Sequence, residues 1–88
     1  MKTFLDNIKR INKFDEMIRS EKTGPPDKCA ETLHCAESTF NDFLRFYRDL
    51  IKPKGISIIF DDEFQTYRYS KKGSFHIELI WDVDKNNV

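Results

Sequence analysis

Asn41 and Arg45 lie four residues apart in a segment with a helical apolar pattern, which places them on one side of a helix. An Asn amide can pair bidentately with adenine, and an Arg guanidinium can pair with guanine or with a phosphate. Asp42 beside them accepts a hydrogen bond only from cytosine and otherwise repels the DNA backbone. Alone, such side chains are more typical of a solvated helix face, so their meaning depends on the elements around them.

Four side chains could in principle ligate zinc: Cys29, His34, Cys35 and His76. The two cysteines are separated by five residues, which is not a recognised zinc-site spacing. Both fall where the expected fold requires small apolar residues. We therefore predict reduced core thiols, with no disulfide and no metal.

Catalytic patterns are also missing from the sequence. Asp61, Asp62 and Glu63 are consecutive, so they alternate in direction and form a solvated turn rather than a cation site. No nucleophile elbow, glycine-rich phosphate loop or spaced Ser/His/Asp or Cys/His set is present, and 88 residues leave little room for a substrate pocket. We expect a protein that is not an enzyme and that has no cofactor.

Fifteen basic and fifteen acidic residues give a net charge of zero, although many DNA-binding domains are basic. Residues 37–54 carry four basic and three acidic groups, whereas residues 56–70 carry one basic and three acidic groups. No apolar run is long enough to cross a membrane, and the first twenty residues carry charges throughout. The composition predicts one small cytoplasmic domain over residues 1–83, with a polar tail over residues 84–88.

Three helices are predicted from the apolar spacing. The first spans about residues 3–20, with Phe14 on its buried side and Asp15 on the far side. Gly24 suits the C-cap of this helix, and Pro26 suits the first turn of the next. A break at residues 34–36 separates this short second helix from the third, which spans about residues 37–52. Its buried positions are Phe40, Phe43, Leu44 and Tyr47.

The rest of the chain alternates apolar and polar residues as strands do. Residues 56–60 and 65–69 form a predicted hairpin around an acidic loop, and a turn at residues 70–73 leads to a predicted third strand. The sequence thus predicts an α+β winged helix-turn-helix: three helices followed by a small antiparallel sheet, made of the wing hairpin and a third strand.

The chain resembles the small stand-alone winged helix-turn-helix proteins of bacteria, which are similar to the DNA-binding domains of DeoR-type repressors. The resemblance covers residues 4–80 and is carried by TGPP at 23–26, CAETL at 29–33, STFNDFL at 38–44, ISIIFD at 56–61, QTYRY at 65–69 and GSF at 73–75. It implies a transcriptional regulator of double-stranded DNA whose helix around residues 37–52 reads the major groove. The residues implied near the base edges are Ser38, Thr39, Asn41, Asp42 and Arg45.

The chain departs from that pattern at the turn between the second and third helices. His34 stands where such proteins often have Gly, Ala36 replaces the usual Ser or Thr cap, and Glu37 replaces a commonly basic residue. We expect a positive φ at His34, and either a shifted helix start or the loss of a cap worth about 1 kcal/mol.

Two further surfaces are candidates for partners. Arg48, Arg68, Lys71 and Lys72 could contact phosphates, although lysines in a turn are often simple solubilising charges. Phe75, Ile77, Leu79 and Trp81 would line one face of the third strand, as a homodimer surface or as a face packed on the first helix. A winged helix that binds another protein through its nearly neutral recognition surface is the alternative function.

Overall fold

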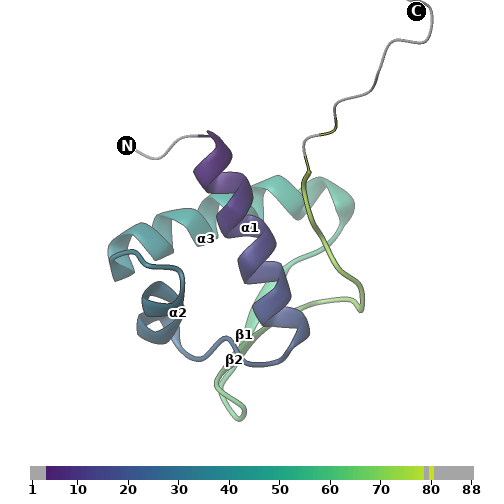
Figure 1. Cartoon of the computed structure of the whole chain (residues 1–88). Coiled ribbons are helices and arrows are strands. Elements are labelled where there is room, and N and C mark those ends of the chain that lie inside the picture. The colour runs from purple at the N-terminus through teal and green to yellow at the C-terminus, as the bar shows by residue number, and fades with distance from the viewer. Residues whose placement is uncertain (1–3, 79, 81–88) are drawn as a thin grey trace, which may run out of the picture.

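The computed structural model describes residues 4–78 and 80. Its elements are α1 (Phe4–Arg19), α2 (Pro26–Thr32), α3 (Glu37–Ile51), the 3-10 helix η1 (Lys52–Lys54), β1 (Ile58–Asp61) and β2 (Thr66–Tyr69). Helix α1 crosses α3, and both α2 and the hairpin lie below α3 in the view of Figure 1. The predicted three helices and hairpin are confirmed, and this α+β arrangement is compatible with a winged helix.

The sheet has two antiparallel strands, in which Ile58 pairs with Tyr69 and Asp61 with Thr66. The prediction of a third strand is wrong for residues 75–78, which form no strand. This segment instead runs along α1, where the Asn12 side-chain amide donates to Ile77 O (2.6 Å) and accepts from Ile77 N (2.8 Å). Side chains of α1 thus supply the hydrogen bonds that a neighbouring strand would have supplied.

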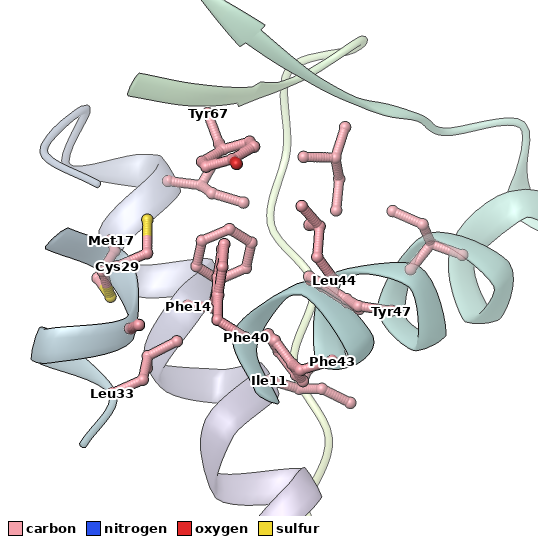
Figure 2. Packing of buried hydrophobic residues seen from close by; sticks show 14 residues of the cluster. Ile11, Phe14, Met17, Cys29, Leu33, Phe40, Phe43, Leu44, Tyr47 and Tyr67 are labelled. Atoms are coloured by element: carbon pink, nitrogen blue, oxygen red, sulfur yellow. The ribbon is translucent and has the colours of Figure 1, made fainter. Parts of the chain in front are cut away.

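The core is an aromatic cluster centred on Phe14 of α1 (Figure 2). The Phe14 ring makes edge contacts with Phe40, Phe43 and Tyr47 of α3 and with Tyr67 of β2, at centroid distances of 5.5–6.1 Å. Each such pair adds about 0.5–1.5 kcal/mol beyond the area that it buries. One α1 side chain therefore joins α3 to the hairpin.

Both short loops after α1 and α2 begin with the same C-terminal motif. Glu21 N donates to Ile18 O (3.0 Å) and Lys22 N to Met17 O (3.2 Å), with Glu21 at φ +57°. This is a Schellman motif, so the left-handed residue that follows the end of α1 is Glu21 and not the expected Gly24. Gly24 lies three residues later at φ +74°, where a Cβ would come within 2.9 Å of the Lys28 Cβ.

The turn between α2 and α3 repeats that geometry. His34 N donates to Glu31 O (3.1 Å) and Cys35 N to Ala30 O (2.9 Å), with His34 at φ +55°. The expected positive φ at His34 is confirmed, and its cause is the second Schellman motif. Ala36 is the N-cap of α3 and makes no side-chain cap hydrogen bond, so α3 keeps its predicted start without a cap.

Asp15 is buried, which contradicts the expectation that it faces away from the core. Its carboxylate accepts hydrogen bonds from Arg19 Nε (2.8 Å), Tyr69 Oη (2.5 Å) and Phe75 N (2.7 Å). Tyr69 Oη also lies 2.5 Å from Tyr47 Oη. Burial raises the pKa of Tyr47 to about 12 and also raises the pKa of Tyr69. Both phenols are therefore neutral at physiological pH. This network ties α1, α3, β2 and residue 75 together.

A second buried contact ties the α1–α2 loop to β2. Thr23 Oγ1 accepts a hydrogen bond from Tyr67 N (2.8 Å) and lies 3.1 Å from Thr66 Oγ1. Cys29 is buried as predicted, and its thiol donates to Thr23 O (3.3 Å). Burial raises the pKa of Cys29 to about 11, so the thiol stays protonated.

In the part of the chain that the structure describes, no helix is long and apolar enough to cross a membrane.

Candidate nucleic-acid interface

The outward face of α3 carries three rows of side chains. At about 100° per residue, Asn41, Arg45, Arg48 and Lys52 lie within an arc of about 60°, and we name this row the basic stripe. The Arg48 guanidinium donates to Ile58 O through Nη2 (2.9 Å) and Nε (3.2 Å). Because Ile58 begins β1, the basic stripe lies on the side of α3 that faces the hairpin.

Two other rows follow around the helix. Asp42 and Asp49 form an exposed acidic row beside the basic stripe. Beyond them lie Phe46 and Leu50, whose side chains remain 46% and 40% exposed. Thr39 belongs to this third row, because it lines a groove with Phe46 and with residues of α1. The structure therefore places Thr39 about 160° around the helix from Asn41, while Ser38 is exposed between the basic stripe and the acidic row.

The arginines predicted to contact DNA differ in their partners. Arg45 Nη1 lies 3.6 Å from Asp42 Oδ1, and both side chains are more than three-quarters exposed. Such a surface ion pair contributes about 0–1 kcal/mol, so Arg45 can exchange its carboxylate for a base or a phosphate at little cost. Arg48, by contrast, is committed to the carbonyl of Ile58 and acts as a positioning residue for β1.

Arg68 is held within the hairpin. Its guanidinium donates to Glu21 Oε1 (2.6 Å) and Asp61 Oδ2 (2.9 Å) and lies over the Phe64 ring, 5.5 Å from its centroid. The hydrogen bonds to these two carboxylates raise the pKa of Arg68. Two carboxylates therefore compensate the positive charge of Arg68, which was predicted to contact a phosphate.

The tip of the hairpin is acidic and exposed. Asp61 Oδ1 accepts hydrogen bonds from Glu63 N (3.0 Å) and Phe64 N (3.2 Å), which closes the turn. The hydrogen bond from Arg68, followed by those backbone amides, lowers the pKa of Asp61. Asp62 and Glu63 point to solvent without ion pairs among the described residues, as expected for a solvated turn.

Lys71 and Lys72 are exposed in the turn that follows β2. This turn folds back against the C-terminal end of α3, since Lys71 Nζ would lie 3.6 Å from a Cβ at Gly55. A cavity of about 170 Å³ lies between them and is lined by Ile51, Ile56, Tyr69 and residues 71–75. The two lysines thus lie at the base of the hairpin, at the opposite end from the acidic tip.

The four residues predicted as a dimer surface are placed in part. Phe75 and Ile77 are half-buried and pack against the core, and the Phe75 ring lies 6.0 Å from that of Tyr47. Packing on the domain itself therefore accounts for these two side chains. Leu79 and Trp81 lie outside the described residues. Dimerisation through this strip stays a prediction.

Within residues 4–78 and 80, no three His, Cys, Asp or Glu side chains gather as a metal site would require. Cys29 and Cys35 are both free thiols. No protein family, curated protein or solved structure matches this chain.

The sequence reasoning missed one member of the site, Lys52. Its signal was available, because Lys52 continues the spacing of four, three and four residues that begins at Asn41. No pattern in the sequence indicates that Arg68 pairs with Glu21, because the two positions are 47 residues apart.

Proposed function

We propose that this protein is a winged helix-turn-helix regulator that binds double-stranded DNA with α3 in the major groove. Helices α2 and α3 meet across a tight turn, and the hairpin follows α3 directly, as in winged helix domains. The resemblance to small bacterial proteins of this class supports the same proposal, including a role in transcription.

The observation that carries the proposal is the position of the basic stripe. Asn41 and Arg45 are exposed on the side of α3 that Arg48 fixes next to β1, so a duplex in contact with α3 also meets the hairpin. A helix-turn-helix domain uses this relation of helix and wing to contact base edges and backbone together. The nearly neutral total charge is compatible with it, because Arg45, Arg48 and Lys52 lie together in the basic stripe.

The test is selection of a duplex from a random pool at low salt, followed by measurement of Arg45→Ala on the selected sequence. We expect Arg45→Ala to weaken binding by about 1–3 kcal/mol and to relax the preference at one base position. Lys9→Ala removes an exposed cation from α1 and serves as the control, which should keep the preference. A pool in which no sequence is enriched would contradict the proposal.

A second candidate function, binding of another protein, is favoured by the third row of α3. Phe46 and Leu50 are exposed apolar side chains next to the acidic row, and exposed apolar groups often mark protein contacts. If this function is correct, Phe46→Ser removes binding of a partner and Arg45→Ala does not. The two substitutions thus separate the candidates on one helix.

A further inference from the structure

Positive charge without a fixed partner is concentrated at one end of the molecule. All five arginines are engaged: Arg10 over the Phe43 ring, Arg48 on a carbonyl, and Arg19, Arg45 and Arg68 on carboxylates. In the part of the chain described, six lysines form no ion pair, and four of them are Lys52, Lys54, Lys71 and Lys72. We name these four the lysine cluster.

The fold brings the two halves of this cluster together. Lys52 and Lys54 belong to η1, and Lys71 reaches over Gly55, the residue that ends η1. The base of the hairpin holds this arrangement, because Ser70 N donates to Ser57 O (2.8 Å) and Ser57 N donates to Ser70 Oγ (2.9 Å). Like charges repel, so their gathering on a small surface indicates a polyanionic partner.

The lysine cluster also continues the basic stripe. Lys52 lies about 20° around the helix from Asn41 and about 10 Å along its axis from Arg45. The major groove is about 12 Å wide. When the middle of α3 contacts base edges, its C-terminal end therefore reaches the backbone that borders the groove.

We propose that the lysine cluster is the phosphate anchor of this protein and binds consecutive phosphates of one DNA strand beside the groove that α3 enters. This inference rests on the proposed DNA-binding function. It assigns the backbone contact to the base of the hairpin, with Lys52 and Lys54 as new members, and not to Arg68 or the tip.

The test compares two variants of equal charge. One replaces the lysine cluster with glutamine (Lys52→Gln, Lys54→Gln, Lys71→Gln, Lys72→Gln). The other replaces four lysines of α1 and α2 and of the loop between them (Lys9→Gln, Lys13→Gln, Lys22→Gln, Lys28→Gln). All eight side chains are exposed, and unfolding curves check that both variants fold. Affinity for the selected duplex is measured from 50 to 200 mM salt.

Each phosphate contact contributes about 0.9 to the slope of log affinity against log salt concentration. We expect the cluster variant to lose about 2–4 from that slope and to keep the base preference of the unmodified protein. The α1–α2 variant should lose less than about 1. An unchanged slope in the cluster variant, or equal losses in both variants, would overturn the anchor while leaving DNA binding intact. An unmodified protein that binds no duplex would instead overturn the proposed function, and the anchor with it.

Discussion

The two ends of the β-hairpin differ in charge and in how they are held. The tip carries Asp61, Asp62 and Glu63 and is closed by exposed hydrogen bonds to one side chain. The base lies beside the lysine cluster and is fixed by the part-buried Asp15–Tyr69–Tyr47 network. Under the proposed function, this difference favours the base of the hairpin, and not its acidic tip, as the end that would contact a phosphate backbone.

The largest effect expected from this contrast is loss of stability when the base network is broken. Asp15→Ala removes the acceptor for Arg19, Tyr69 and the Phe75 amide, so the amide loses its partner and the Tyr69 phenol keeps only Tyr47. We expect the free energy of unfolding to fall by about 2–4 kcal/mol, measured by urea titration, because these donors lose a buried charged acceptor. A loss below about 1 kcal/mol would show that the network does not fix the base.

A smaller loss is expected from Tyr69→Phe, which keeps the ring and removes only the hydroxyl that joins Asp15 to Tyr47. The free energy of unfolding should fall by about 1–3 kcal/mol, since both former partners stay buried. Thr32→Val provides the comparison, because the hydroxyl of Thr32 makes an exposed hydrogen bond to Lys28 O within α2. Equal losses in the two variants would contradict a special role for the base.

At the tip, Asp61→Ala should lower the thermal midpoint less than Tyr69→Phe does, because its hydrogen bonds from the turn amides are exposed and the one from Arg68 is only part-buried. The pKa of Asp61 is lowered in the folded state, so its contribution is full above the unfolded pKa and is lost as the pH falls through the folded value. The variant should therefore differ from the unmodified protein at pH 7 and approach it at pH 2. A difference that persists at pH 2 would indicate loss of the turn itself.

The smallest effect is expected from removing the free charges of the tip. Four strand residues separate tip from base by about 13 Å, which exceeds the Debye length of about 8 Å at physiological salt. Asp62→Ser with Glu63→Ser should leave the salt slope of DNA binding within about 0.5 of its original value. A steeper slope would place the tip beside phosphates and reverse the assignment of the two ends.

Local patterns in the sequence predicted α1, α3 and the hairpin. Apolar spacing gave α1 and α3 within a residue or two of their bounds, and the same spacing placed Asn41 and Arg45 together. A helical period identifies apolar positions and cannot show that Asp15 is buried, because its partners Tyr69 and Phe75 lie 54 and 60 residues away. The third strand was wrong for a related reason: alternation marks an extended segment but does not identify its partner, here Asn12 of α1.

The most direct test of DNA binding through α3 and the hairpin base is a titration of the ¹⁵N-labelled protein with its selected duplex. The NMR chemical shifts of the backbone amides are measured at each step. DNA binding through α3 and the hairpin base predicts the largest shifts at residues 38–55 and 70–73, with residues 62–64 at the tip nearly unchanged. Largest shifts at the tip, or at Asn7 and Arg10 beside Phe46, would contradict it.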